Sequence, residues 1–513
     1  MDETRSVLQA AYRQSVLYRI SAFWKKAWAE SCLRALLVWL LSRPFLDEGC
    51  ALRRGMSKLN ARLGRCDGLN RAIEGSTLYR IWAAVCRAGR QSRFLGMIFQ
   101  NGMTGVLLLI LALYTPIDYL LRDVYAIPVV SSGWDEGLLL LAIFWVILLR
   151  VRERPSLPAA SSPLDFPVAQ FLLVCLFLFV ILLTRPEINF AGLRATAQYI
   201  LWFYLATRLI RTRKQCMMVY YIMAAVAAII SLHGIYQFIV AAPIPSNWVD
   251  QAEIAVRTRV FSIFGSPNIM GDYMVMFAPM MAALAYCLKN KSVKLICWFF
   301  TFTMCFSCLF TMSRGAWIAM VVAVLVFAAL VDRRLILLMV LAFVAALFLP
   351  FVASRIGYLF TSEYAASAAR GGRSVRWEKA ISYLYANNPL IGIGFGRFGG
   401  AVAMQNQEST WMKYFYTDNY YVKILSENGY LGLVSFVLMM VGVVWSGLRG
   451  WFRKRHTAVS PLCAGMLASL SGVLVHCYFE NIFEEPYMAV SFWTIAAMMV
   501  YLGFIEDRIS SAE

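Results

Sequence analysis

The sequence predicts an all-α membrane protein that crosses the bilayer many times. Of its 513 residues, 60% are hydrophobic and only 15% are charged, and the mean hydropathy is +0.63. Soluble proteins carry roughly 45–50% apolar and about 25% charged residues, so most of this chain cannot face water. The composition excludes a soluble enzyme, a disordered chain and a small disulfide-stapled secreted domain.

Apolar runs recur along the chain from residue 103 onward. A spanning helix needs about 20 predominantly apolar residues to cross roughly 30 Å of hydrocarbon. Twelve runs reach or approach that length, at 103–121, 137–150, 166–184, 190–207, 217–240, 269–288, 295–311, 315–332, 335–353, 430–448, 459–478 and 487–505. We therefore expect about 12 transmembrane helices and one large loop, residues 354–429.

Lys and Arg residues are concentrated on one side of this arrangement. With the N-terminus inside, more than two thirds of the 48 Lys and Arg residues fall before the first span, in inner loops or in the tail. Cytoplasmic loops are enriched in these residues, so both termini are predicted to be cytoplasmic. Eight of the outer cations lie in the 354–429 loop. Long loops escape the charge rule, so this cluster needs its own explanation.

The N-terminal region is basic and contains no run long enough to span. FWKKAWAESCLRALLVWLL (23–41) predicts a basic amphipathic helix on the anionic inner leaflet. It is either a membrane anchor, which its composition favours, or a docking site for a partner. The first residues, MDETRSVLQAAYRQ, predict no cleavable signal peptide. The predicted regions are the cytoplasmic 1–102, nine spans in 103–353, the outer loop 354–429, three spans in 430–505 and the cytoplasmic tail 506–513.

Ionisable groups are rare inside the predicted spans. Asp272 lies near a span end, and His233 and His476 are the histidines at membrane depth. A proton-coupled pump needs a relay of such groups, so any chemistry is expected on the outer face. Cys305 and Cys308 form a C-x-x-C inside an apolar run, which we interpret as helix core because free cysteines are usually buried.

Four segments on the predicted outer side carry residues that could do chemistry. They are RTRVFSIFGSPNIMGDY (257–273), TMSRGAWIA (311–319), GGRSVRWEKAISYLYANNPLIGIGFGRFGG (371–400) and YFYTDNYYVKILSENGYLGL (414–433). The first contains two arginines and an Asn-containing turn, and the second holds one arginine in a short turn between two spans. Arginines at span edges point to an anionic ligand.

The third segment predicts an amphipathic helix along the outer interface. Its apolar residues follow i, i+3, i+4, i+7 spacing: Trp377, Ala380, Ile381 and Leu384. Asn387, Asn388 and Pro389 end it. Two arginines lie at its N-terminal end, where backbone N–H groups and the helix dipole favour an anion. GFGRFG (394–399) follows no predicted strand, so we interpret it as a flexible turn that lets a ligand approach closely, and not as a nucleotide site.

These segments, in this order, resemble the O-antigen ligase / O-antigen polymerase family of bacterial integral-membrane glycosyltransferases. The strongest parts are SRGA (313–316), R-W-x-x-A…N-P-x-x-G-x-G-x-G (376–396) and D-N-Y-Y…E-x-G-x-x-G (418–432). The resemblance covers roughly residues 100–505. It implies a GT-C-like fold in the inner membrane and an active site on the outer face. Members move a glycan from an undecaprenyl-diphosphate carrier to an acceptor sugar.

The resemblance also implies the partners. They are a lipid-linked glycan donor, an acceptor glycan or glycolipid, membrane lipids and other polysaccharide-assembly proteins, with no nucleic acid. No cofactor is implied, and no cluster of metal-ligating residues is visible in the outer segments, so we expect no metal. Ligases of the family usually have His-Asn where this chain has Asp418-Asn419. This difference favours polymerisation of repeat units, with ligation to lipid A-core or another acceptor as the alternative.

The chemistry of a diphosphate-linked sugar suggests a role for each residue. Arginine forks bind phosphate oxygens in pairs, stay charged and can stabilise developing charge without a metal. The predicted catalytic residues are Asp418, Arg314 and Arg376. The predicted diphosphate- or substrate-binding residues are Arg257, Arg259, Asn268, Arg373, Asn419 and Glu427.

Asp418 is the candidate base for the acceptor hydroxyl, which would imply a single inverting displacement. A carboxylate beside arginines is a weak base, so its other possible role is to orient Asn419 or an arginine. Two other classes of protein stay open: a transporter, and a non-catalytic subunit of a polysaccharide export complex. A transporter should place broken helices and polar groups at the midplane, whereas a non-catalytic subunit should tolerate loss of the arginines.

The predicted topology can be tested with one added cysteine. In a Gln405→Cys variant, a membrane-impermeant thiol reagent should label intact cells above the background of the unmodified chain. Labelling that requires permeabilised cells would contradict the orientation and move the predicted site to the inner face.

Overall fold

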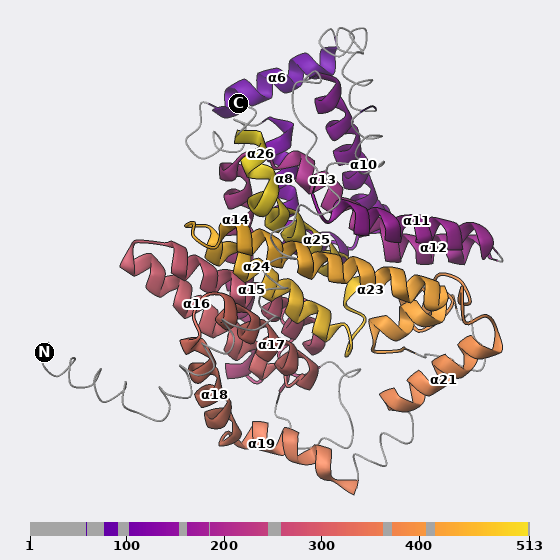
Figure 1. Ribbon diagram of the computed structural model, residues 1–513, viewed down its shortest axis with the longest axis vertical. Helices are drawn as coiled ribbons and strands as arrows, with labels where there is room; N and C mark the ends of the chain where they lie inside the picture. The colour runs from indigo at the N-terminus through magenta and orange to yellow at the C-terminus, as the bar shows by residue number, and fades with distance from the viewer. Residues whose placement is uncertain are drawn as a thin grey trace, which may run out of the picture. The chain divides into compact units, whose positions relative to one another are not determined.

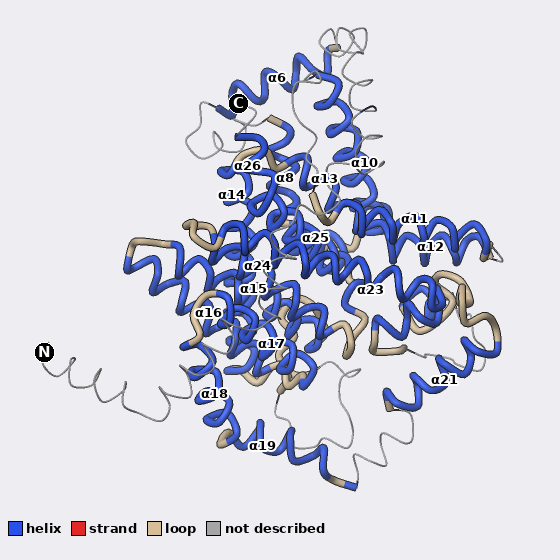
Figure 2. The backbone as a smooth tube through the Cα atoms, in the orientation of Figure 1, coloured by secondary structure: helices blue, strands red, loops and turns tan. Residues whose placement is uncertain are grey.

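The computed structural model describes residues 76–90, 102–152, 162–183, 185–244, 258–362, 372–406 and 416–510, together with Lys58. These residues form helices joined by turns, with no β-strand among them, so the all-α prediction is confirmed for this part of the chain (Figure 2). All of the described residues belong to one compact unit, Glu48–Glu513. The predicted helix at 23–41 lies outside the described residues.

The helices of the first half of the chain include several that are short or broken. They are α6 Thr77–Arg90, α8 Met103–Ala112, α9 Tyr114–Tyr119, η1 Leu120–Val124, α10 Pro128–Arg152, α11 Asp165–Ile181, α12 Pro186–Ala197, η2 Gln198–Ile200, α13 Leu201–Leu209 and α14 Arg213–Ile239. The predicted span at 190–207 is therefore not one helix, because α12, η2 and α13 divide it. The span at 137–150 lies within the longer α10.

The helices of the second half include α23, which is the longest among the described residues. They are α15 Pro267–Cys287, α16 Lys291–Phe310, α17 Arg314–Leu330, α18 Arg334–Leu347, α19 Pro350–Gly357, η4 Tyr358–Phe360, α21 Arg373–Ala386, α22 Ala401–Gln405, α23 Tyr420–Lys454, α24 Ser460–His476, η5 Ile482–Glu484, α25 Pro486–Val500, η6 Tyr501–Ile505 and α26 Glu506–Ser510. The predicted helix of the third outer segment is confirmed as α21, although Ile381 on its expected apolar face is exposed.

Five described helices are long and apolar enough to cross a membrane: α14, α15, α16, α23 and the α25–η6–α26 run, Pro486–Ile509. The number rises to 7 if two bent pairs each count as one span. These are α8 with α9–η1, bent by 73°, and α18 with α19–η4, bent by 85°. The chain is thus a multi-pass membrane protein, and the remaining spans of the predicted twelve stay a prediction.

Small residues let α24 pack closely between α15 and α17 (Figure 1). A Cβ on Gly465 would lie 2.8 Å from the Pro279 carbonyl oxygen of α15. A Cβ on Gly472 would lie 2.5 Å from Val275 on α15 and 2.9 Å from Ala323 on α17. Glycine at such contacts is typical of membrane helices, whose association depends on van der Waals packing.

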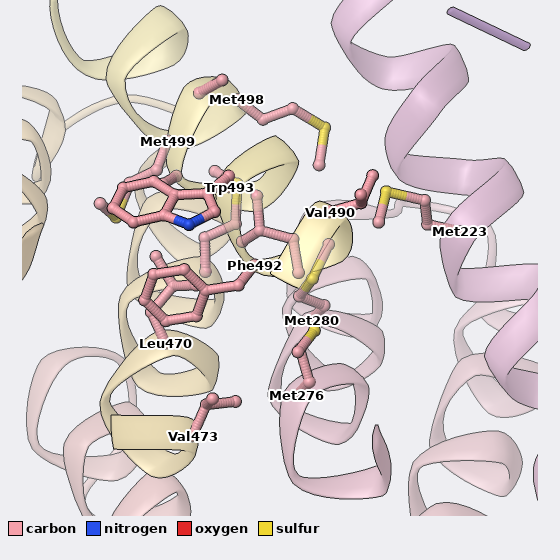
Figure 3. Close-up of a cluster of buried hydrophobic side chains, with 14 of the residues drawn as sticks. Met223, Met276, Met280, Leu470, Val473, Val490, Phe492, Trp493, Met498 and Met499 are labelled. Carbon is pink, nitrogen blue, oxygen red and sulfur yellow. The ribbon is translucent and has the colours of Figure 1, made fainter. Parts of the chain in front are cut away.

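The apolar core extends from this contact to α14 and α25. Figure 3 shows Met276 and Met280 of α15, Met223 of α14, and Phe492 and Trp493 of α25 gathered in one cluster. All five side chains are buried. Flexible methionine side chains fill irregular gaps between helices, so this cluster joins α14 and α25 to α15, whose first turn contains Asn268.

The connecting loops gather at two opposite ends of these helices. At one end the Val260 N–H donates to Phe310 O at 3.2 Å, and the Tyr420 N–H donates to Cys477 O at 2.8 Å. At the other end Lys454 pairs with Asp507 and Arg213 lies 3.8 Å from Glu506. Loops predicted to be outer therefore lie together, as do loops predicted to be inner.

Helix α23 begins well before the predicted span at 430–448 and is broken at Gly429. Gly429 has φ 63° and ψ −168°, a conformation that only glycine adopts readily. A Cβ there would lie 2.4 Å from the Leu390 carbonyl carbon. The loop at 389–394 packs into this break, with Tyr430 N–H donating to Pro389 O and Gly394 N–H donating to Glu427 O, both at 2.9 Å.

The glycines of the predicted flexible turn therefore permit contact between protein segments. A Cβ on Gly192 of α12 would lie 2.2 Å from the Gly396 nitrogen, and one on Gly394 would lie 2.8 Å from Asn189 Oδ1. The interpretation of this turn as a close approach for a ligand is not supported. Its glycines fix the 392–400 loop against α12 and α23.

Candidate active site

Two arginines and an aspartate from distant parts of the chain meet at the start of α21. Arg376 Nη2 donates to Asp418 Oδ2 at 2.6 Å, and Nη1 donates to the Tyr416 carbonyl oxygen at 2.6 Å. Arg373 Nε lies 3.6 Å from the same Asp418 oxygen. These side chains are half-buried, so they form charge-assisted contacts while still reaching solvent.

The backbone around Asp418 explains how its side chain reaches the arginines. Asp418 has φ 46°, in the left-handed region that Asp adopts more readily than most residues. Asn419 follows as the N-cap of α23, because its side-chain oxygen accepts from Val422 N–H at 3.1 Å. Trp377 Nε1 donates to Thr417 O at 2.8 Å. The turn is thus held between α21 and α23, and Asn419 has a local role in the turn.

A third arginine reaches the site from the loop before α15. Arg259 is buried, and its Nε donates to Thr311 O at 3.1 Å. Its Nη2 donates to Asn268 Oδ1 at 3.4 Å, and the Asn268 amide nitrogen in turn donates to Glu480 Oε2 at 2.7 Å. Asn268 lies in the first turn of α15, which Ser266 caps. Arg259, Asn268 and Glu480 therefore form one hydrogen-bonded chain.

Arg314 is the first residue of α17, and Ser313 caps that helix. Its Nη1 donates to Arg355 O at 3.5 Å, while Arg355 Nε donates to Met312 O at 3.1 Å. Arg355 belongs to α19 and was not predicted as a site residue. Because it ties α19 to the 311–314 turn, it helps to fix the position of Arg314.

The arginines of these segments lie close enough to affect one another. Burial, together with the positive charges of Arg314 and Arg373, lowers the pKa of Arg259 to about 10. Arg259 still carries its charge near neutral pH. A region that holds several cations this close together favours binding of a polyanion.

Glu480, like Arg355, is a residue of this region that the sequence did not predict. It is only 5% exposed, and burial raises its pKa, as does the negative charge of Asp418. The hydrogen bonds from Asn268 and from the Asn481 N–H act in the opposite direction. The signal was present in FENIFEEP (479–486), where three glutamates fill a short loop between two apolar runs.

Glu427 lies in a different environment from the other predicted residues. It is fully buried, accepts from Lys423 Nζ at 2.8 Å and also accepts from Phe398 N–H at 3.3 Å. Lys423 Nζ also lies 3.5 Å from Glu484, which accepts from Tyr416 OH at 2.5 Å. These contacts give Glu427 a place in a buried ion-pair network that supports the 392–400 loop.

A buried polar pair lies next to the start of α17. His476 Nδ1 and Asp272 Oδ1 are 3.0 Å apart, and both side chains are buried. A Cβ on Gly315 would lie 3.1 Å from the His476 ring and 2.7 Å from Phe479. The pair links α15 to α24 directly beside Arg314.

The structure therefore brings together most of the predicted residues. Four arginines and Asp418 lie at one end of the helices, with Asn268 and Glu480 completing the set: Arg259, Arg314, Arg373 and Arg376. Arg257 lies outside the described residues. Within the described ranges, no group of three or more His, Cys, Asp or Glu side chains is placed to hold a metal ion. The site combines a cluster of four arginines with two carboxylates, Asp418 and Glu480.

The comparison with protein families agrees with this geometry. Residues 299–437 match the family model Wzy_C, described as O-antigen ligase. Over this stretch the chain is similar to that enzyme family, so the resemblance inferred from the motifs is confirmed there. The matched stretch contains Arg314, Arg373, Arg376 and Asp418, whereas Arg259 and Glu480 lie outside it. No curated protein matched the chain.

The ion-pair network of Glu427 can be tested by mutation, to show whether Glu427 stabilises the fold or binds substrate. Lys423→Met should destabilise the protein by about 3–5 kcal/mol, because it leaves a buried carboxylate without its cation. The double variant Lys423→Met/Glu427→Gln should recover part of this loss. The measurement is the thermal unfolding midpoint of the detergent-solubilised protein. Equal midpoints for the wild type and the Lys423→Met variant would contradict the structural role.

Proposed function

We propose that this protein is a membrane glycosyltransferase that moves a glycan from an undecaprenyl-diphosphate carrier to an acceptor sugar on the outer face of the membrane. The observation that carries this proposal is the group of four arginines, contributed by three separate segments, around two carboxylates at one end of the helices. The match to the O-antigen ligase family supports the same reaction class.

In this mechanism the arginines neutralise the leaving group. A diphosphate-linked sugar is already activated, so breaking its anomeric C–O bond requires stabilisation of the negative charge that develops on the diphosphate. Arg314 and Arg376 would bind phosphate oxygens directly, supported by Arg259 and Arg373. Fixed guanidinium groups do this without reorganising during the reaction. Twelve spans with both termini in the cytoplasm would place this region outside.

The ion pair of Asp418 supports its alternative role. Its Oδ2 atom faces both Arg376 and Arg373. Both contacts engage the same carboxylate oxygen, so the side chain of Asp418 is held by two cations. Asp418 would therefore orient the two arginines toward the diphosphate, and the acceptor hydroxyl would give its proton to another group.

An apolar pocket beside the site suits the lipid part of the carrier. It is lined by apolar side chains of α23 and α24, including Tyr421, Met440, Val444, Trp445 and Leu474. Tyr421 lies three residues after Asp418 in the sequence, so the pocket begins close to the arginine region. A polyprenyl chain whose diphosphate is bound by the arginines would lie along this pocket.

Two forms of the reaction remain as candidates. Asp418 stands where related ligases usually have histidine, which favours polymerisation of surface-polysaccharide repeat units. The family description, O-antigen ligase, favours transfer of a finished glycan to lipid A-core or another acceptor. We propose polymerisation as the main function and ligation as the second.

Polysaccharide analysis of a deletion strain separates the two forms. Loss of a polymerase should leave single repeat units on the lipid acceptor, because ligation continues without chain growth. Loss of a ligase should instead leave long chains on the undecaprenyl carrier. A polysaccharide of unchanged length and attachment would contradict both forms of the proposal.

Arginine variants test the diphosphate site in the same strain. Arg259→Ala, Arg314→Ala and Arg376→Ala should each fail to restore polysaccharide while inserting into the membrane at the wild-type level. The corresponding lysine variants should recover little activity, because an ammonium cannot make the paired contacts of a guanidinium. If all three alanine variants restore normal polysaccharide, a non-catalytic assembly role gains support.

A further inference from the structure

We propose that Glu480 is the base that accepts the proton of the acceptor hydroxyl, in the glycan transfer proposed above, on which this inference rests. Glu480 belongs to the short segment between α24 and α25. It was not singled out by any sequence motif, and it lies outside the stretch that matches the family model.

The position of Glu480 fits this role. Its Oε2 accepts from Asn268 at 2.7 Å, and Asn268 binds Arg259. Its segment is fixed against the Asp418 turn, because Tyr420 N–H donates to Cys477 O and Thr417 Oγ1 donates to Asn481 Oδ1 at 3.2 Å. Glu480 therefore lies between the Arg259 side and the Asp418 side of the arginine region.

Four other carboxylates near the site are engaged by a cation or a histidine, and Glu485 is instead hydrogen-bonded to Tyr487. Asp418 pairs with Arg376, and Glu427 and Glu484 both face Lys423. Asp272 is hydrogen-bonded to His476. Among the described residues, no Lys, Arg or His nitrogen lies within 4.0 Å of the Glu480 carboxylate.

The surroundings of Glu480 also suit proton transfer. Burial and the charge of Asp418 raise its pKa above the ordinary glutamate value, which makes it a better base than an ion-paired carboxylate. Three other titratable groups interact electrostatically with Glu480: His476 of α24, Tyr416 of the Asp418 turn and Glu485 at the start of α25. Asn268 of α15 stabilises the ionised form through its hydrogen bond.

The step is a single displacement at the anomeric carbon. The acceptor oxygen forms the new C–O bond while the bond from the anomeric carbon to the diphosphate oxygen breaks. The bonding electron pair leaves with the diphosphate, whose charge the arginines stabilise. The acceptor proton moves to the Glu480 carboxylate and is later released to water, so atoms and charges balance without a further reactant.

The test uses the full-length protein in proteoliposomes with its lipid-linked glycan donor, and follows product formation as a function of pH. The wild type should lose activity on the acidic side, where Glu480 is protonated. Glu480→Gln should lower kcat by about 10²–10⁴-fold and remove this acidic limb. The matched control is Glu378→Gln, an exposed carboxylate on α21, which should keep the wild-type rate and pH profile.

Binding of undecaprenyl diphosphate without sugar provides a second readout. Glu480→Gln should bind this probe within about twofold of the wild type, because the arginines that hold the diphosphate are retained. Asn268→Ala should move the acidic limb to higher pH, since it removes a hydrogen bond that favours the charged carboxylate. This shift keeps the proposal testable if Glu480→Gln does not fold.

Several results would overturn the assignment. A Glu480→Gln variant with a kcat within tenfold of the wild type and an intact acidic limb would exclude Glu480 as the base. Loss of probe binding together with activity would give Glu480 only a role in positioning Arg259 through Asn268. An unshifted limb in Asn268→Ala would also contradict the proposal. If the wild type transfers no glycan, the proposed function itself fails, and this inference with it.

Discussion

The close packing of α24 between α15 and α17 is the constraint on which the site depends. Gly465 and Gly472 allow backbone-to-backbone approach along this contact. Arg314 begins α17, Asn268 lies in the first turn of α15, and Glu480 follows the end of α24. A change in the spacing of these three helices would move all three groups relative to one another. The positions of these three proposed site residues are therefore set by apolar contacts between the helices.

The site keeps its charges in two separate arrangements. At the surface, Arg376 and Arg373 share Asp418, and this contact leaves the positive charge in excess. Behind the 392–400 loop, Lys423 is balanced by Glu427 and Glu484, both carboxylates. A buried pair of this kind contributes little net stability, because its desolvation offsets its attraction. The pair does hold the 392–400 loop in one conformation, so Arg373 and Arg376 lie next to a rigid part of the protein.

Sequence reasoning predicted the parts of the site that depend on local signals. The N-terminus of α21 with Arg373 and Arg376, the arginine at the start of α17 and the polar turn at Asp418 all follow from spacing and helix-end residues. It did not predict Glu480 or Arg355, and it assigned Glu427 to substrate. Glu427 pairs with Lys423, four residues earlier on the same helix. The roles of Glu480 and Arg355 depend on contacts across more than 40 residues, as between Asn268 and Glu480 or Arg355 and Met312. Periodicity carries no information on such contacts.

The Asp272–His476 pair has a consequence for how the protein is made. Asp272 lies inside α15, and an unpaired carboxylate in a membrane helix costs up to about 3.5 kcal/mol on insertion scales. Among the five long apolar helices, α15 is the second most buried, because other parts of the protein cover almost all of it. Its partner histidine is translated 204 residues later. Helix α15 is therefore synthesised well before the histidine that pairs with its buried carboxylate.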